Sequence, residues 1–218
     1  ERCGLEFRTG YDAATSRRSL NLLFAEWSNR GLNMWTVEQI TQPLARLSSS
    51  SSVATYPIGA VTATVGALTD IQSTVDILEA VVRRSSSDIG ITRISRSDYL
   101  NTPDKDTQGR PTQFFVDRQI TPTVTLWPSP QNSTDELIYY RVRRIEDADA
   151  GVNTADLPFR FLPCLVAGLA YYIALKKSPD RIGLLKDIYE EEFQRAASED
   201  GERTALRLVP SYSSLSLT

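Results

Sequence analysis

The residues that could bind a metal ion begin at Asp104. Oxygen-bearing side chains recur at Asp104, Asp106 and Gln108, and Gly109 follows in the sixth position. An EF-hand calcium loop opens in the same way, with oxygen ligands at alternate positions before a glycine. The twelfth position, however, is Phe115, where such a loop needs a bidentate glutamate. We therefore expect a polar loop here and no bound metal.

A run of carboxylates at Glu190, Glu191 and Glu192 is the second candidate for chemistry. Glycoside hydrolysis needs two carboxyl groups that face each other across a cleft, one protonated and one ionised. Consecutive residues of a helix point in different directions, so this run does not form such a pair by itself. The sequence therefore supplies no clear acid–base site.

Histidine is absent from the sequence, which excludes several kinds of catalytic site. Ser-His-Asp and Cys-His nucleophiles, zinc sites with histidine ligands and imidazole acid–base catalysis all need that side chain. Cys3 and Cys164 form no CxxC motif, and Cys164 lies in an apolar segment where an inert buried thiol is expected. No GxxxxGK[ST] loop or Rossmann fingerprint occurs. We expect no catalytic residue, no metal and no cofactor.

The charge balance gives little support for tight binding to nucleic acid. The 24 Lys and Arg residues face 27 Asp and Glu residues, so the formal net charge is -3, whereas phosphate neutralisation needs a basic surplus. A local basic patch occurs at Arg141, Arg143 and Arg144, after Tyr139 and Tyr140. Acidic residues follow at once, so we expect an edge strand with charged flanks here.

The sequence also bears on the compartment. No apolar run approaches the ~20 residues of a membrane span, and no signal-peptide core follows the start of the chain. The cysteines offer no disulfide framework of a secreted domain. We expect a protein that is soluble and intracellular when made, without contact with a membrane.

Apolar spacing predicts a helix near each end of the chain. In residues 12–30 one helical face is apolar, with Gly31 as a stop: Leu20, Leu23, Phe24 and Trp27. Residues 159–175 are apolar on nearly every face and predict a buried helix, in which Pro163 marks either a kink or a late start.

A further helix is expected to begin at Ser178 and Pro179. Its apolar stripe is formed by Ile182, Leu185, Tyr189, Phe193 and Ala196. Its opposite face is charged and carries Lys186, Asp187, Glu190, Glu191 and Arg195. Such a face is either solvated or available to a partner.

Strand-forming residues fill the middle of the chain. The β-prone runs are residues 34–40, 60–65, 75–84, 89–94, 114–117, 121–127 and 137–143. Ser95 can cap a short helical turn. The stretch from 44 to 74 is too rich in Ser, Thr and Ala to assign: it holds either one or two strands, of which the alternating run 60–65 is one candidate, or a mobile excursion. The spacing of the later strands predicts a small antiparallel sheet.

Together these patterns predict an α+β protein. Residues 1–33 are expected to form the N-terminal helical part of a bundle, residues 34–150 an inserted β-rich domain, and residues 151–202 the C-terminal helices of the bundle. Residues 203–218 are expected to form an extended tail, whose leucines would stay unburied in a lone chain. This profile favours a structural or interaction role.

Three long segments resemble the head-to-tail adaptor (connector) family of short-tailed bacteriophages, of the tail tubular protein A type. They are residues 17–39 (RRSLNLLFAEWSNRGLNMWTVEQ), 91–130 (ITRISRSDYLNTPDKDTQGRPTQFFVDRQITPTVTLWPSP) and 156–200 (DLPFRFLPCLVAGLAYYIALKKSPDRIGLLKDIYEEEFQRAASED). These strings follow the order of the family and are too long and specific for a chance match. Residues 44–74 depart from the family pattern.

The resemblance implies a structural virion protein at the head–tail junction, present in the host cytoplasm during assembly. It implies a ring of about twelve copies, attached beneath the portal, that continues the DNA channel and presents a platform to the tail nozzle. The partners are then further copies of the chain, the portal protein, the nozzle protein and, transiently, the genomic DNA.

The resemblance also implies roles for parts of the chain. The helical bundle would make most ring contacts, for which the exposed face with Lys186, Asp187, Glu190, Glu191 and Arg195 is the candidate. The β part would face the tail. The C-terminal segment would grip the portal through Leu206, Leu208, Val209, Tyr212, Leu215 and Leu217.

Two other functions stay open. A virion-associated peptidoglycan hydrolase with a Glu/Asp pair would need one carboxyl group buried among apolar groups, with a raised pKa. A free DNA-binding protein would bind bare DNA in a salt-sensitive way, which the charge balance disfavours.

Overall fold

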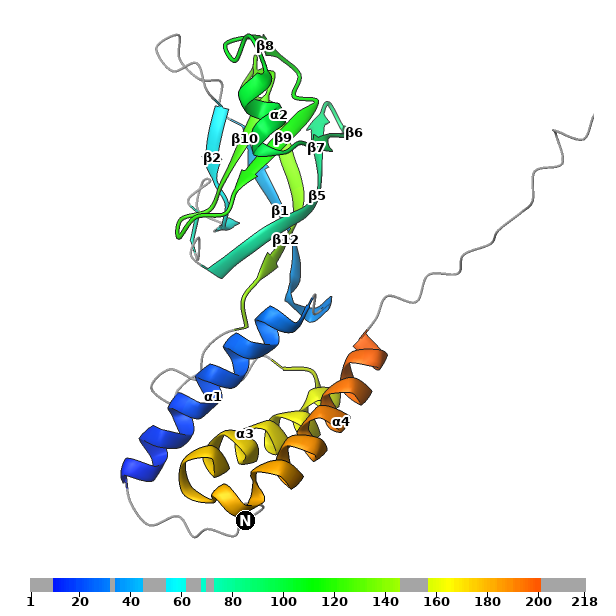
Figure 1. Cartoon of the computed structure of the whole chain (residues 1–218). Coiled ribbons are helices and arrows are strands. Elements are labelled where there is room, and N and C mark those ends of the chain that lie inside the picture. Colours follow the sequence, from blue (N-terminus) through cyan, green and yellow to red (C-terminus); the bar gives the residue numbers. More distant parts are fainter. Residues whose placement is uncertain are drawn as a thin grey trace, which may run out of the picture.

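The computed structural model describes residues 10–31, 34–44, 54–61, 68–69, 73–145 and 157–200. A helical part and a β part lie at opposite ends of an elongated shape and meet at a narrow waist (Figure 1). The helical part holds α1 (Gly10–Arg30), α3 (Leu162–Lys177) and α4 (Ile182–Asp200). The β part holds the elements between α1 and α3, so the helical part is built from both ends of the described chain.

The β part consists of sheets that pack face to face. The first has the order β1 (Val37–Pro43), β12 (Glu136–Arg143), β5 (Thr74–Arg84) and β6 (Ser87–Gly90), all antiparallel. The second has the order β2 (Ala54–Pro57), β10 (Thr123–Trp127), β9 (Gln113–Asp117) and β7 (Thr92–Arg93), in which β7 runs parallel to β9. Both sheets contribute to one apolar core, for example through Leu137 and Phe114.

Short elements complete the β part. They are β3 (Ala60–Val61) with β4 (Leu68–Thr69), β8 (Gln108–Gly109) with β11 (Ser129–Pro130), and α2 (Arg96–Asn101). Ser95 caps α2 as predicted, because its hydroxyl accepts a hydrogen bond from the Asp98 N–H while the Asp98 carboxylate accepts one from the Ser95 N–H.

The structure confirms the α+β class but changes the predicted sheet. In the described residues, the single small antiparallel sheet is replaced by facing sheets with a parallel pair at one edge. β7 is only two residues long and pairs with a strand distant in sequence, so no local pattern reveals it. The strand predicted from residue 34 begins only at Val37, because Met34–Thr36 forms a 3₁₀ turn before β1.

The apolar stripes predicted for the first and last helices are confirmed. In α1, Leu23 and Trp27 are buried, and Gly31 has a φ of +148° directly after the helix, a conformation that favours glycine. In α4, Leu185 and Tyr189 are buried.

α3 begins at Leu162 after a 3₁₀ turn at Phe159–Phe161, so Pro163 marks a late start and no kink. The stretch Phe159–Lys177 has 19 residues and is apolar enough, by length and composition alone, to cross a membrane, which corrects the expectation from the sequence. Core helices of globular proteins pass the same test, and α3 packs against both α1 and α4. Only 33% of its most apolar window is buried, so α3 keeps exposed apolar surface.

We expect Gly168→Val to destabilise the helical part. A Cβ at Gly168 would lie 2.8 Å from Leu23 Cδ1 and 2.9 Å from Tyr189 Cε2, and both side chains are buried. Overpacking of this kind costs about 1–3 kcal/mol, which a lower midpoint of urea unfolding would report. Gly183→Ala on α4 is the control, because nothing lies within 4 Å of a Cβ there. An equal loss of stability in both variants would contradict this packing.

We expect the stability contributed by Asp135 to depend on pH. The pKa of this buried carboxyl group is lowered, because Arg84 donates to its two oxygens at 2.8 and 2.6 Å. Its contribution is present above an unfolded pKa of about 3.9 and is lost as the pH falls through the folded pKa. Asp135→Asn should therefore unfold in less urea than the unaltered chain at about pH 7, and the difference should shrink at about pH 3. An equal difference at both pH values would show that the charge is irrelevant.

Candidate assembly surfaces

Trp27 joins α1 to the C-terminal helices. Its indole N–H donates to the Tyr189 hydroxyl on α4 at 2.9 Å. The centroid of its ring lies 5.6 Å from that of Phe161 and 6.2 Å from that of Phe193. Burial is the main cause that raises the pKa of Tyr189 above its usual value. Helices separated in sequence by the whole β part therefore share one core.

Arg30 fixes the end of α1 to α4. Its guanidinium donates to both carboxylate oxygens of Glu190 at 2.6 and 2.7 Å and also to Glu26. The same group lies over the rings of Tyr189 and Phe193, at 5.0 and 4.5 Å from their centroids. The hydrogen bonds from Arg30 lower the pKa of Glu190. Glu190, expected from the sequence to contact a neighbouring copy, thus has an ionic partner in its own chain.

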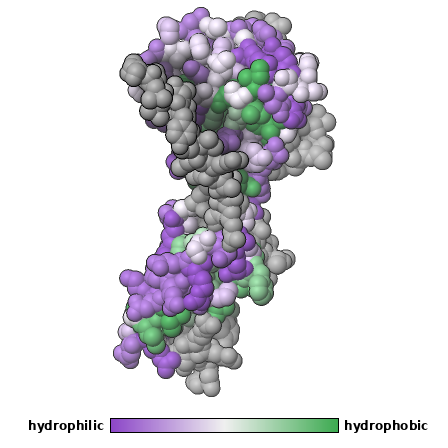
Figure 2. Space-filling view, turned by 90° about the vertical axis from the view of Figure 1, so that its right-hand side faces the viewer, coloured by the Kyte–Doolittle hydropathy of each residue, from purple (hydrophilic) through white to green (hydrophobic). Residues whose placement is uncertain are grey.

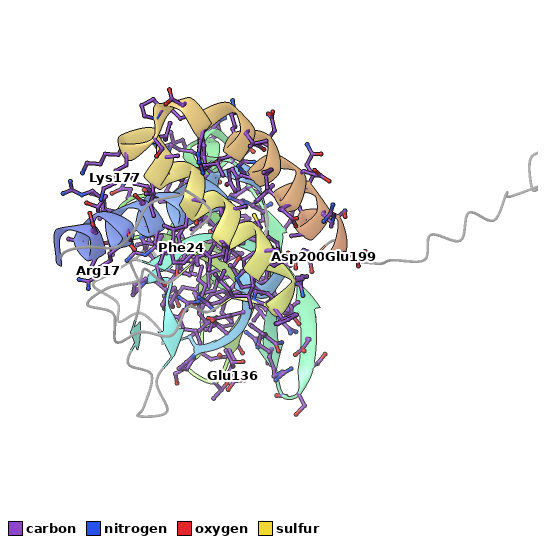
Figure 3. All side chains as sticks on the ribbon, turned by 90° about the horizontal axis from the view of Figure 1, so that it is seen from below. Arg17, Phe24, Glu136, Lys177, Glu199 and Asp200 are labelled. Atoms are coloured by element: carbon purple, nitrogen blue, oxygen red, sulfur yellow. The ribbon has the colours of Figure 1, made fainter. Side chains whose placement is uncertain are left out.

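The other residues of the predicted ring-contact face lie on the outside of α4. Arg195 donates to Glu191 at 2.8 Å across one helical turn, while Lys186 and Asp187 are exposed. Asp187 forms no ion pair with any residue in the part of the chain that the structure describes. Seen from below, Arg17 on α1 and the α4 end with Asp200 lie on opposite sides of the helical part (Figure 3).

Large apolar side chains are exposed on the helical part. Phe159 is 86% exposed beside α3, Leu184 on α4 is 66% exposed, and Leu22 on α1 is 53% exposed. Leu162 and Val166 are also exposed, one and two turns after Phe159. Figure 2 shows apolar patches next to hydrophilic surface on this part.

These side chains correct an expectation from the sequence. The run 159–175 was expected to be buried throughout, but α1 and α4 leave Phe159, Leu162 and Val166 uncovered. The sequence carried one signal for this, since a helix that is apolar all round needs more cover than two amphipathic helices can give. The exposed stripe is therefore a feature that sequence reasoning missed.

Shallow hollows lie along the outer side of α1. One, of about 350 Å³, is lined by Asn21, Phe24, Ala25, Ser28, Asn29, Arg144 and Ile145. Another, of about 370 Å³, is lined by Ala14, Arg17, Arg18, Asn21 and Leu22. Within the described ranges, Arg17 and Arg18 form no ion pair. The α1 side is thus concave and basic.

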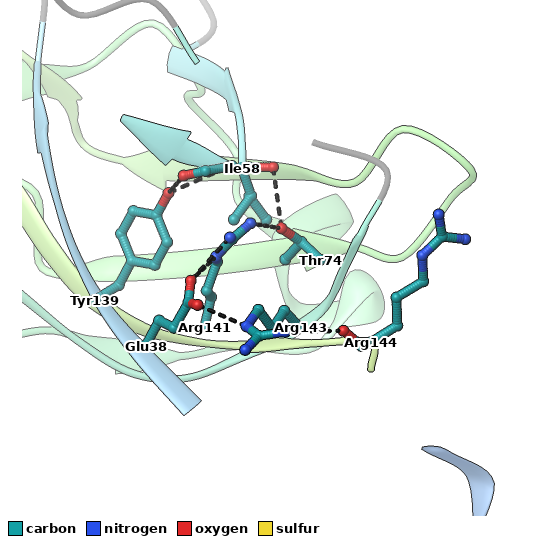
Figure 4. A network of polar contacts seen from close by, with 8 residues as sticks. Glu38, Ile58, Thr74, Tyr139, Arg141, Arg143 and Arg144 are labelled. Carbon is teal, nitrogen blue, oxygen red and sulfur yellow. Dashed lines mark hydrogen bonds and ion pairs between the residues drawn. The ribbon is translucent and has the colours of Figure 1, made fainter. Parts of the chain in front are cut away.

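A buried arginine organises the waist end of the β part (Figure 4). Arg141 on β12 is 1% exposed and donates to Glu38 on β1 and to the Thr74 hydroxyl on β5, each at 2.9 Å. The Thr74 hydroxyl donates to the carbonyl oxygen of Ile58 at 3.3 Å, and Arg143 donates to the other Glu38 oxygen at 2.6 Å. This network links β1, β5, β12 and the segment after β2.

The interpretation of β12 as a charged edge strand is therefore wrong. β12 lies between β1 and β5 in the first sheet, so its arginines meet partners on both neighbours. Arg141 is buried and Arg143 is partly buried, whereas Arg144 is exposed. The three arginines do not form a common basic surface.

The side chains considered for metal binding or catalysis are hydrogen-bonded within their own loop or buried. The Asp104 carboxylate accepts hydrogen bonds from the Asp106 N–H and the Thr107 hydroxyl, both at 2.9 Å. Cys164 is buried, as predicted, and burial raises the pKa of its thiol to about 12. Hydrogen bonds from neighbouring groups lower the pKa of several carboxyl groups in the described residues: Asp88, Asp98, Asp104, Asp135 and Glu190. Among the same residues, no group of three His, Cys, Asp or Glu residues could hold a metal ion.

Part of the predicted site lies outside the described residues. The expected portal-binding side chains are all in this part: Leu206, Leu208, Val209, Tyr212, Leu215 and Leu217. Residues 45–53, 62–67 and 70–72 of the unassigned stretch are outside it too.

Comparison with protein families gives a match over nearly the whole chain. The family model described as SU10 adaptor protein matches residues 11–211, which include α1, the β part, α3 and α4. A search of curated proteins found no match.

We expect Arg141→Met to destabilise the β part by about 2–3 kcal/mol, because removal of one partner leaves buried polar groups unsatisfied while Glu38 keeps some access to water. Urea unfolding followed by circular dichroism would measure the loss. Arg195→Met, which breaks an exposed pair on α4, should change stability by less than about 1 kcal/mol. Similar effects of the two substitutions would count against a structural role of the Arg141 network.

Proposed function

We propose that the chain, which belongs to the SU10 adaptor protein family, joins the phage head to the tail. As a member of that family it is a phage adaptor protein and a structural component of the virion. About twelve copies would form a ring beneath the portal, continue the channel for the DNA and present a platform to the tail nozzle. We place the protein at the head–tail junction of the virion, after assembly in the host cytoplasm. The resemblance of residues 17–39, 91–130 and 156–200 supports the tail tubular protein A type.

The family match over residues 11–211 is the observation on which this proposal rests. The shape of the molecule supports it, because the helical part and the β part offer separate ends to different partners (Figure 1). The helical part also exposes Phe159 and Leu184, which suit contacts with neighbouring copies. In this arrangement the helical part makes the ring and the β part faces the tail.

The C-terminal segment is proposed to grip the portal. Between residues 206 and 217 its sequence supplies the large side chains Leu206, Leu208, Val209, Tyr212, Leu215 and Leu217. Apolar side chains at this density favour docking on another protein. The net charge of -3 fits a conduit for DNA as well, since a channel that bound phosphates tightly would impede passage.

We propose no catalytic role, no cofactor and no membrane contact. A peptidoglycan hydrolase would need a carboxyl group with a raised pKa in an apolar cleft, whereas hydrogen bonds from Arg84 and Arg30 lower the pKa of Asp135 and of Glu190. A ring that holds two parts of a virion together acts through its contacts alone.

We expect the purified chain to bind the portal protein of the same phage as a ring of about twelve copies. Native mass spectrometry of the chain alone, of the portal alone and of their mixture would give the copy number. A chain ending at Arg203 lacks the proposed portal-binding side chains, so its affinity for the portal should fall at least about 100-fold.

The matched control keeps the full length but replaces Ser213 and Ser214 by Ala, which leaves the leucines of the segment in place. This variant should bind the portal like the unaltered chain. No complex with the portal at any concentration would overturn the head-to-tail role, and lysis of cell walls by the purified chain would support the hydrolase alternative instead.

A further inference from the structure

We infer that Phe159 of one copy inserts into the hollow between α1 and Ile145 of the next copy. This inference rests on the proposed ring and specifies which surfaces meet in it. The hollow is the one lined by Phe24, Ala25 and Ile145, together with Arg144. The occupant is a second copy of this chain.

Phe159 has the character of an anchor residue. It is 86% exposed although it is a large aromatic side chain, and the exposed Leu162 and Val166 follow it along the same side of α3. Its neighbour Arg160 forms an ion pair with Asp200 at the end of α4, which holds the start of α3 in place. A projecting aromatic side chain on a fixed backbone is the kind of residue that contributes most to association.

The hollow on α1 has matching chemistry. Its floor is apolar because Phe24 and Ile145 are almost fully buried there, and Ala25 leaves room above them. Its volume of about 350 Å³ is at the lower end of ligand pockets and accommodates an aromatic ring. Arg144 lines the rim and is exposed, so its guanidinium can lie over an inserted ring.

The two surfaces are unlike and lie on different elements of the helical part. The Arg160–Asp200 ion pair places the start of α3, and Phe159 with it, beside the end of α4, whereas the hollow is lined by residues of α1 together with Arg144 and Ile145. Contact between two unlike surfaces is head-to-tail, and it closes into a ring when it repeats around an axis.

The exposed charges on α1 and on α4 are also of opposite sign. The α1 side exposes Arg17 and Arg18 around the second hollow, next to the exposed Leu22. On α4, Asp187 is exposed one turn after the exposed Leu184. Within the described ranges none of these three charges has an ion-pair partner. Opposite charges beside apolar contacts favour a contact between α4 of one copy and α1 of the next. They disfavour a two-fold symmetric contact between the α1 surfaces of two copies.

Phe159→Ser tests this contact in the full-length chain. Self-association would be followed by analytical ultracentrifugation, alone and with the portal protein. The substitution should raise the concentration needed for half-assembly at least about tenfold. Ile120→Ser is the matched control, because Ile120 is also 86% exposed but lies in the β part. It should assemble like the unaltered chain, and both variants should unfold at the same urea concentration as that chain.

Cross-linking identifies the partner surface. Phe159→Cys and Ala25→Cys would be made separately in a Cys3→Ser background, in which the remaining native thiol, Cys164, is buried. On mild oxidation, a mixture of the two should give disulfide-linked dimers, and a chain with both substitutions should give a ladder of higher species. Dimers formed by Phe159→Cys alone, in place of the mixed species, would mean a symmetric contact and overturn the inference.

The outcomes separate this inference from the proposed function. Rings on the portal that persist in Phe159→Ser, without the mixed cross-link, overturn this contact and leave the proposed function standing. Loss of rings in Phe159→Ser together with the mixed cross-link supports both. Failure of the unaltered chain to associate with itself, alone or on the portal, overturns both.

Discussion

The packing of Trp27 imposes the constraint on which the rest of the molecule depends. Its indole joins α1 to Phe161 and Tyr189, which follow the whole β part in sequence. To close that core, the chain must leave the helical part and return to it at the same place. β1 and β12 therefore run side by side over the full length of β1, from Val37 opposite Val142 to Pro43 opposite Glu136.

The pairing of β1 with β12 produces the narrow waist between the β part and the helical part. Arg141 and Arg143 both reach Glu38 across the β1–β12 pair, and the Arg144 N–H donates to the carbonyl oxygen of Ser73 at 2.7 Å. The next residue, Ile145, is buried in the apolar core of the helices. Contacts thus lead without interruption from the sheet to the helical core. The proposed linking role needs such a connection, because the position of one end must fix that of the other.

The shared core around Trp27 also explains why the helices of the helical part expose different kinds of surface. α3 is apolar nearly all round, and among the described helices α1 and α4 cover part of it, with Gly168 close to Leu23 and Tyr189. Phe159 before α3 and Leu184 on α4 stay exposed, while α1 presents shallow hollows with Arg17 and Arg18. In the proposed head-to-tail ring, each copy would bury these apolar side chains and pair these charges.

Local spacing was enough to predict α1 and α4 and to limit Pro163 to a kink or a late start of α3, because the repeat of a helix and the effect of a proline act within a few residues. The α+β class and the buried Cys164 followed for the same reason. The tertiary structure decided that β7 joins β9, that β12 is a central strand and that Arg141 is therefore buried. It also decided that Glu190 is bound by Arg30 and that Phe159 is exposed. These features depend on which distant segments pair and on which side of a helix is covered, and neither is encoded in the order of neighbouring residues.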